Sequence, residues 1–213
     1  MATRSARVSQ CQKPKGLVGR FVLWRMNASH SKLTDWGISH ISIESRFIIL
    51  DVGCGGGRTI SKMAASAGQG KVYGVDYSKE SVLAAKKNNA HWIAVGRVEI
   101  CEGSVSKLSF SNETFNLVTA VETHFWWPNL QSDLGEVLRI LKPGGKLIVI
   151  AEVYKGADTV ISKLAEKHAS RTGMTLLSVD EHRELFVNAG YSDVEVIEER
   201  DKGWICGIGR KPS

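Results

Sequence analysis

Runs of apolar residues, separated by segments with helical patterning, divide most of the chain into short alternating units. The run RFIILDV at 46–52 is almost entirely apolar, which indicates a strand buried on both faces, as in a parallel sheet. Stretches between such runs carry apolar residues three and four positions apart, the spacing of amphipathic helices. The predicted strands are 46–52, 71–76, 97–103, 114–121, 146–152, 193–199 and 203–211. The predicted helices are 59–67, one that begins after Ser78, 130–142, 158–170 and 179–189.

Alternation of strands and helices predicts a parallel sheet with helices on both faces. Two helix starts carry local signals: Ser78 is a favoured N-cap residue, and Ser178 with Glu181 has the spacing of a capping box. The Pro-Gly-Gly at 143–145 is expected to turn the chain into the fifth strand. A tight turn at 200–202 joins the last two strands, so this hairpin is expected to add an antiparallel strand at the edge of the sheet.

The first 45 residues precede the alternating pattern and differ from it in charge. Apolar residues recur at helical spacing within 16–41, which predicts two helices broken near 27–31. Residues 1–34 contain no acidic residue and seven basic ones: Arg4, Arg7, Lys13, Lys15, Arg20, Arg25 and Lys32. We therefore expect three parts: a basic, flexible tail (1–14), a helical N-terminal cap (15–45) and one α/β domain (46–213).

The formal net charge of +6 resides in this basic start. Without residues 1–34 the chain has 21 basic and 22 acidic residues, a balance of −1. The body of the chain is therefore not a basic platform, and nucleic acid is not an expected partner. The basic start itself is either a disordered tail or an organelle transit peptide.

Four cysteines are widely spaced: Cys11, Cys54, Cys101 and Cys206. Without a C-x-x-C pair they indicate neither a zinc site nor a disulfide framework, and no metal is expected. Reduced thiols are typical of a cytoplasmic protein. No window approaches the roughly 18 consecutive apolar residues that span a bilayer, and the start has no signal-peptide pattern. We therefore expect a cytoplasmic protein that does not act in a membrane.

The strongest chemical signal is LDVGCGGG at 50–57, which lies between a predicted strand and a predicted helix. Gly53, Gly55 and Gly57 remove Cβ atoms where a ligand would contact backbone. A strand–helix turn needs only one glycine, so this loop indicates a binding site. The spacing fits a dinucleotide fingerprint poorly, because Arg58 stands where the third glycine of G-x-G-x-x-G would fall.

With Asp51 at the strand end, the pattern D-x-G-x-G-x-G resembles motif I of the class I S-adenosylmethionine-dependent methyltransferases. VDYS (75–78) and LRILKPGG (138–145) match the same family, and the resemblance covers about residues 46–152. It implies a Rossmann-like, doubly wound seven-stranded sheet, mostly parallel with an antiparallel C-terminal hairpin strand. It also implies S-adenosylmethionine as cofactor.

In that family the glycine loop wraps the amino-acid part of the cofactor. The acidic residue that precedes the loop helps to hold the cofactor. Asp76 would accept both ribose hydroxyls and Tyr77 would lie against the adenine. Family members frequently have Gly-Asp after the third strand, where this chain has Gly103-Ser104, so the adenine contact is the least secure. The cofactor-binding residues that the resemblance implies are Asp51, Gly53, Cys54, Gly55, Gly57, Asp76, Tyr77, Ser78, Gly103, Ser104, Val105 and Val121.

The segment VETHFWWPNL (121–130) follows the fourth strand and would border the methyl donor, because ligands bind at the carboxyl ends of parallel strands. His124 is the candidate general base, since its ordinary pKa allows proton uptake near neutral pH. The alternative is a histidine bonded to backbone or water. Glu122 is the second catalytic candidate, to bind an amine or balance the sulfonium charge, or else it faces solvent.

Aromatic residues supply the candidate acceptor contacts. Trp126 and Trp127 point in different directions, so we expect one to lie in the core and the other in the pocket. Trp36 and His30 would belong to a lid over the cofactor. Asn129 is expected to cap the next helix.

Within the family, the chain is similar to the small-molecule, ubiquinone/menaquinone-type branch. No N/D-P-P-Y/F motif follows the fourth strand, and no long insertion could recognise a macromolecule. The predicted function is methyl transfer from S-adenosylmethionine to a small acceptor by in-line displacement. Two alternatives are a catalytically silent cofactor-binding protein and a nucleic-acid methyltransferase guided by the basic start. The pattern leaves the acceptor atom and the oligomeric state open.

Overall fold

The computed structural model describes residues 31–213, and this region contains seven strands. They are β1 Ile48–Val52, β2 Lys71–Asp76, β3 Val98–Glu102, β4 Phe115–Val121, β5 Leu141–Ala151, β6 Ser192–Glu199 and β7 Trp204–Arg210. The helices are α3 Ser31–Ile38, α4 Arg58–Ser66, α5 Lys79–Asn88, α6 Ala90–Ala94, the 3₁₀ turn η1 His124–Trp126, α7 Leu130–Ile140, α8 Val160–Thr172 and α9 Val179–Asn188. The expected tail, the first cap helix and His30 lie outside the described residues.

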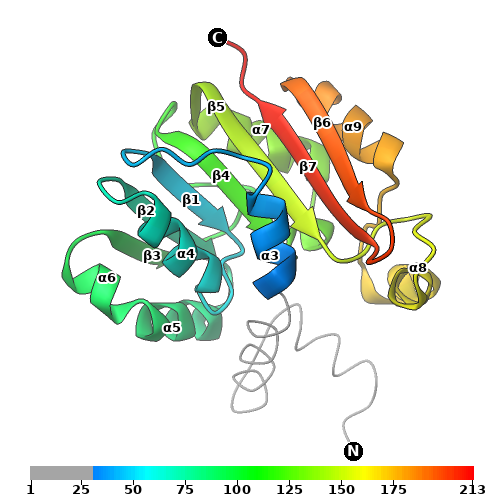
Figure 1. Cartoon of the computed structure of the whole chain (residues 1–213), viewed down its shortest axis with the longest axis horizontal. Coiled ribbons are helices and arrows are strands. Elements are labelled where there is room, and N and C mark those ends of the chain that lie inside the picture. The colour runs from blue at the N-terminus through cyan, green and yellow to red at the C-terminus, as the bar shows by residue number, and fades with distance from the viewer. Residues whose placement is uncertain (1–30) are drawn as a thin grey trace, which may run out of the picture.

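The strands form one sheet in the order β3-β2-β1-β4-β5-β7-β6 (Figure 1). β1 to β5 pair in parallel, whereas β7 pairs antiparallel with both β5 and β6. The predicted fold class, a mostly parallel doubly wound sheet with an antiparallel C-terminal strand, is confirmed.

The C-terminal hairpin lies at the edge of the sheet and pairs antiparallel, as the sequence predicts, but the pattern left the order of its two strands open. β7 lies inside the sheet, and β6 forms the edge. The burial of the two strands explains this order: residues 205–209 of β7 are all buried, while β6 has no fully buried residue. β7, the more apolar strand, lies inside the sheet, and the acidic strand β6 forms its edge. Charged side chains are common on exposed edge strands.

Two local predictions need correction. β5 begins at Leu141, because residues 143–145 form an irregularity within the strand, where the pairing with β4 shifts between Phe115 and Leu117. Asn129 occupies the N-cap position of α7, but its side chain makes no capping bond. Its backbone N–H donates instead to Asp133, in the first turn of that helix. The capping box of Ser178 and Glu181 is confirmed at α9.

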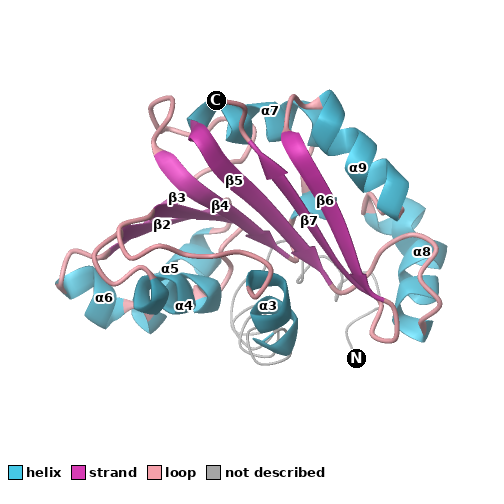
Figure 2. Cartoon of the chain, turned by 45° about the horizontal axis from the view of Figure 1, so that its top comes forward, coloured by secondary structure: helices cyan, strands magenta, loops and turns pink. Residues whose placement is uncertain are grey.

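Helices cover both faces of the sheet (Figures 1 and 2). One core cluster joins α3, α4 and α5 to strand residues such as Ile49 and Ile148. The other joins α7 and α9 to the alternate residues Leu50 and Val149. The alternation follows from the two-residue period of a strand, which turns successive side chains to opposite faces.

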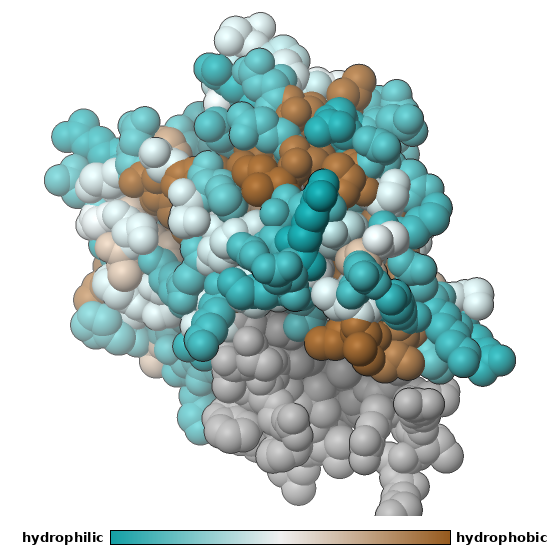
Figure 3. Space-filling model, turned by 45° about the vertical axis from the view of Figure 1, so that its right-hand side comes forward, coloured by the Kyte–Doolittle hydropathy of each residue, from teal (hydrophilic) through white to brown (hydrophobic). Residues whose placement is uncertain are grey.

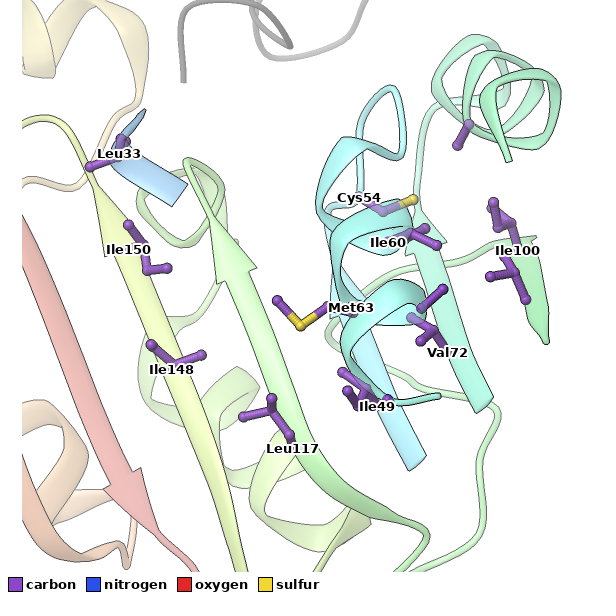
Figure 4. Packing of buried hydrophobic residues seen from close by; sticks show 14 of the residues in the cluster. Leu33, Ile49, Cys54, Ile60, Met63, Val72, Ile100, Leu117, Ile148 and Ile150 are labelled. Atoms are coloured by element: carbon purple, nitrogen blue, oxygen red, sulfur yellow. The ribbon is translucent and has the colours of Figure 1, made fainter. Parts of the chain in front are cut away.

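α3 packs directly on β5 and β7 of the sheet. Figure 4 shows its Leu33 beside Ile150 of β5 at one end of the first core cluster. A Cβ added to Gly37 would lie 2.4 Å from Ile150, so this helix needs glycine for its close approach. Lys62 of α4 forms an ion pair with Asp35, which ties α3 to the neighbouring helix.

α8 stands at the end of the sheet and is largely uncovered. Among its 13 residues only Ser162 is buried, and the side chains of Val160, Ile161 and Leu164 are exposed. Figure 3 shows apolar surface areas on the side of the molecule where α8 and α9 lie. Within residues 31–213 no helix has the length and apolar character needed to cross a membrane.

Candidate functional site

The carboxyl ends of β1, β2, β3 and β4 lie at one edge of the sheet, because these strands run in parallel. Four short segments leave the sheet there: the glycine loop 53–57, Tyr77-Ser78, residues 103–105 and residues 122–127. The topology thus brings together at one edge every cofactor-site and catalytic residue named from the sequence. The acceptor candidates Trp126 and Trp127 belong to the same edge.

The glycine loop adopts backbone conformations that favour glycine. Gly53, Gly55 and Gly57 have φ values of 69°, 51° and 77°, in the left-handed region. The N–H groups of Gly53 and Cys54 donate to the carbonyl of Val75 at 2.7 and 3.1 Å, which ties the loop to β2.

Two neighbours press closely on this loop. A Cβ on Gly53 would lie 2.1 Å from Oγ1 of Thr123, and one on Gly57 would lie 2.9 Å from Cβ of Ala85. Neither position has room for a side chain. The loop is therefore packed between α5 and the segment after β4, with its backbone close to both.

Asp76 ends β2 with its carboxylate turned toward the glycine loop. Oδ2 accepts a hydrogen bond from the Gly55 N–H at 2.9 Å, and Oδ1 accepts from the Ser78 N–H at 2.8 Å. Burial raises the pKa of Asp76, although these two hydrogen bonds act in the opposite direction. A nearly buried carboxylate beside a glycine loop can accept further hydrogen bonds from a ligand's hydroxyl groups.

Asp51 lies in the sheet one residue before the end of β1. Its Oδ1 accepts a hydrogen bond of 2.6 Å from the hydroxyl of Thr119, its pairing partner on β4. Burial raises the pKa of Asp51 to about 7. Asp51 is therefore buried in the core, two residues before the first glycine of the loop. Sequence reasoning missed Thr119, because only the register of β1 against β4 reveals it.

The residues after β2 and β3 differ in exposure. Tyr77 is 40% exposed and Ser78 is fully buried, with its hydroxyl accepting from the Ser81 N–H at the start of α5. Partial burial and the charge of Asp76 raise the pKa of Tyr77 to about 12. The Gly103 N–H donates to the Asp76 carbonyl at 3.0 Å, and the Ser104 hydroxyl accepts from the Ser106 N–H at 3.3 Å.

Three apolar positions complete this edge. Val105 is buried in the core cluster on the α7 side. Cys54 is buried on the α4 side, with Sγ 3.2 Å from where a Cβ on Gly74 would lie. Val121 is half-buried and packs against the same side as Cys54. These three side chains belong to the hydrophobic core next to the polar loops.

Glu122 follows β4 with φ of 57°, an unusual conformation for a residue with a side chain. Its N–H donates to the Ile150 carbonyl at 2.9 Å, and its carboxylate accepts from the Glu152 N–H. Such backbone strain is often found at functional sites. Thr123, which sequence reasoning missed, lies between Glu122 and His124 and contacts Gly53.

His124 is buried, and its Nε2 lies 3.1 Å from Nε2 of His182 in α9. Burial and the nearby His182 hold the pKa of His124 well below its usual range. The ring therefore stays neutral at pH 7. His182, missed by sequence reasoning, is separated from His124 by 58 residues.

The tryptophans divide as follows. Trp127 is buried in the core cluster with Leu134 of α7. Trp126 is half-buried and packs near Phe125. Trp36 packs against Trp204 of β7, with ring centres 5.8 Å apart. Within the described region, no three His, Cys, Asp or Glu side chains are grouped to hold a metal ion.

Comparison with known proteins identifies a methyltransferase domain at residues 49–145. The chain is 25% identical to an O-methyltransferase of Pyrenophora dematioidea, over 75% of this chain and 60% of that protein. It is 35% identical to a demethylmenaquinone methyltransferase of Bacillus mycoides, over 47% of this chain and 43% of that protein. The chain thus spans about half the length of these two relatives.

The fold is also shared with solved structures. The crystal structure of a SAM-dependent methyltransferase from Aquifex aeolicus is similar with a TM-score of 0.72 at 18% identity. The similarity covers 99% of this chain and 100% of that one. The chain therefore contains a methyltransferase domain, has methyltransferases among its relatives, and shares its fold with a solved SAM-dependent methyltransferase.

Proposed function

We propose that this protein binds S-adenosylmethionine at the carboxyl edge of β1, β2 and β4 and methylates a small molecule. The observation that carries the proposal is the buried carboxylate of Asp76 held against the Gly55 N–H. It places a hydrogen-bond acceptor beside a loop in which Gly53 and Gly57 have no space for side chains. An extended ligand with hydroxyl groups at one end fits this combination.

The chain's own residues would share the work. Asp76 would accept the ribose hydroxyls, and the backbone of the glycine loop, residues 53–57, would lie along the amino-acid part. Tyr77 would lie against the adenine, near residues 103–105, while Asp51 and Val121 support the loops from below. When bound, the cofactor supplies a sulfonium methyl, which passes to the acceptor's lone pair while the sulfur keeps the bonding electrons and the acceptor's proton is lost.

The acceptor side would be formed by the segment after β4. Methyl transfer depends chiefly on alignment and on exclusion of water, and alignment alone can contribute about 7–11 kcal/mol. Glu122 to Trp126 border the position of the methyl group. Trp126 is the better aromatic candidate, because Trp127 is enclosed in the core. α3, the described helix of the predicted cap, would lie on the other side of the donor.

A small acceptor fits the architecture. Between β5 and β6 the chain adds only α8, α9 and their loops, and no large insertion follows β4. The relatives named above are an O-methyltransferase and a demethylmenaquinone methyltransferase, both names of small-molecule enzymes. The cysteine pattern supports a cytoplasmic location.

Calorimetric titration of the full chain with S-adenosylmethionine tests the binding step. Saturable binding is expected, and no heat at millimolar cofactor would overturn the proposal. Transfer of a radiolabelled methyl group into a metabolite extract then separates an enzyme from a silent binding protein. Salt-sensitive binding of RNA or DNA that depends on residues 1–34 would instead favour a nucleic-acid substrate.

A further inference from the structure

His124 and His182 form a buried pair that joins the segment after β4 to α9. Their Nε2 atoms lie 3.1 Å apart, within hydrogen-bond distance. Both rings are almost completely buried. Two nitrogens at this distance must share one hydrogen, so one ring donates and the other accepts.

The backbone decides which ring donates. Nδ1 of His182 lies 2.8 Å from the carbonyl oxygen of Ser178, which can only accept. Nδ1 of His182 therefore carries the hydrogen, and its Nε2 is an acceptor in the neutral ring. It follows that Nε2 of His124 carries a hydrogen and donates it to His182. Nδ1 of His124 is left as a hydrogen-bond acceptor.

His182 is held firmly in this orientation. Ser178 begins α9 with a complete capping box, in which Glu181 accepts from its N–H at 2.7 Å. Lys155 forms an ion pair with Glu181 at 2.7 Å and donates its backbone N–H to the Leu177 carbonyl at 2.9 Å. The first turn of α9 is thus fixed at both its cap and its side chains, and the acceptor nitrogen of His182 is fixed with it.

The remaining nitrogen of His124 has no partner. Nδ1 is buried and makes no hydrogen bond with any residue of the described chain. A buried acceptor without a donor is unfavourable, and such groups usually meet a water molecule or a ligand. Burial and His182 also hold the pKa of His124 below its usual range, so that the nitrogen keeps its lone pair at neutral pH.

The place of His124 in the chain connects it to the candidate methyl site. His124 directly follows Thr123, whose hydroxyl lies against Gly53 of the glycine loop. The Trp127 N–H donates to the His124 carbonyl at 3.0 Å, which closes the tight η1 turn that holds His124 beside Thr123.

We propose that His182 is a positioning residue, which holds His124 in the Nε2–H form so that Nδ1 accepts a hydrogen bond from a hydroxyl group of the methyl acceptor. This inference rests on the proposed function and narrows it to acceptors that carry a hydroxyl. A methyl acceptor that has no hydrogen-bond donor, such as a thioether or a tertiary amine, would leave Nδ1 of His124 without a hydrogen bond. His182 itself does not touch the acceptor.

The tautomers can be measured directly in the free protein. Selective ¹⁵N labelling of the six histidines, with long-range ¹H–¹⁵N NMR spectra, distinguishes the protonated nitrogen of each ring. We expect hydrogen on Nε2 of His124 and on Nδ1 of His182. His182→Leu should give a mixture of the Nε2–H and Nδ1–H tautomers of His124. His182→Gln keeps a hydrogen-bond acceptor near Nε2 of His124 and should preserve the Nε2–H tautomer. Hydrogen on Nδ1 of His124 in the unmodified protein would overturn the proposal.

Phenol and anisole test the recognition step as a matched pair, because anisole lacks the hydroxyl hydrogen. With S-adenosylhomocysteine bound, phenol should shift the Nδ1 resonance of His124 and anisole should not. Equal shifts with both probes would refute the hydroxyl preference.

Two variants of His124 separate its nitrogens. His124→Asn keeps an oxygen near the place of Nδ1, and His124→Gln keeps a group near Nε2. We expect the Gln variant to bind phenol at least tenfold more weakly and the Asn variant to stay within about threefold of the unmodified protein; the reverse order would contradict the inference. If S-adenosylhomocysteine does not bind, the proposed function fails, while the tautomer measurement in the free protein still reports on His182.

Discussion

The backbone N–H of Gly55 donates a hydrogen bond of 2.9 Å to Oδ2 of Asp76. This bond joins the loop after β1 to the carboxylate that ends β2. The second oxygen of the same carboxylate accepts from the Ser78 N–H. Asp76 thus organises two of the four segments at the edge of the sheet, before any ligand is considered.

Replacement of Asp76 tests its proposed role in cofactor binding. Asp76→Ala removes the acceptor for the ribose and for Gly55, and charge-assisted hydrogen bonds are the stronger kind. We expect the affinity for S-adenosylhomocysteine, measured by calorimetry, to fall at least tenfold. Glu102→Ala is the matched control, because Glu102 pairs with Asp76 across β2 and β3 but is exposed. Equal affinity in the Asp76 variant would refute the ribose assignment.

Gly53 tests the close contact with Thr123. Gly53→Ala would place Cβ 2.1 Å from Oγ1 of Thr123 and in a left-handed conformation. Gly96→Ala has the same backbone cost, with φ of 75°, but meets no atom within 4 Å. We expect Gly53→Ala to lower the free energy of unfolding by about 1–3 kcal/mol more than Gly96→Ala, as overpacking does. Urea denaturation measures both; equal losses would mean that the loop moves aside freely.

Asp51 makes a prediction about pH. Its folded pKa of about 7 lies above the ordinary 3.8, so the folded state binds this proton more tightly than the unfolded chain does. The stabilising contribution of the proton is complete below pH 4 and is lost as the pH rises to 7. Asp51→Asn removes this dependence.

Denaturation at several pH values measures the effect. Relative to the unmodified protein, Asp51→Asn should become more stable by up to about 4 kcal/mol between pH 4 and pH 7.5, from about three pKa units. If the free energy of unfolding depends on pH in the same way for Asp51→Asn and the unmodified protein, ionisation of the Asp51 carboxyl does not destabilise the folded state.

Arg97 stabilises the end of α4. Its guanidinium donates to the carbonyls of Gly70 and Gly68 at 2.7 Å, of Ala64 at 2.8 Å, and of Ala67. Hydrogen bonds from a charged group contribute about 1.5–3 kcal/mol each, so Arg97→Gln should lower the free energy of unfolding by about 2–4 kcal/mol. Cofactor affinity should stay within about twofold.

Arg183→Gln serves as the control for Arg97, since Arg183 has only an exposed ion pair with Asp180. Such pairs contribute about 0–1 kcal/mol. Thermal or urea unfolding of the two variants side by side measures the difference. Similar losses of unfolding free energy in the two variants would show that water replaces Arg97 as the hydrogen-bond donor to the carbonyls at the end of α4.

The sequence predicts the fold well because its signals are local. The apolar run of β1, the glycine loop and the capping box of α9 each depend on residues close together in the chain, and all three are found in the structure. The order of β6 and β7 could not be read in this way. It depends on which of two similar strands buries more apolar surface against β5, a comparison that requires the assembled sheet.

The candidate site divides along the same line. The glycines, Asp51 and Asp76 stand at strand ends and could be named from the pattern alone. Thr119 contacts Asp51, 68 positions away in the chain, and His182 contacts His124, 58 positions away. No local spacing in the sequence therefore indicates either residue. His124 and Trp127 were named from their position, but burial decides what they can do, and burial follows from packing by α7 and α9.

The interior place of β7 has a consequence for how the chain is made. The first described helix, α3, packs on β5 and β7, and the thiol of Cys206 points to the carbonyl of Gly37 at 3.9 Å. A chain emerging from the ribosome can therefore pair β1 to β5 early, but β6 has no place in the sheet until residues 204–210 have also emerged. Until then, one side of β5 and the part of α3 that packs on β7 stay uncovered, because β7 is the last strand of the described chain to be synthesised.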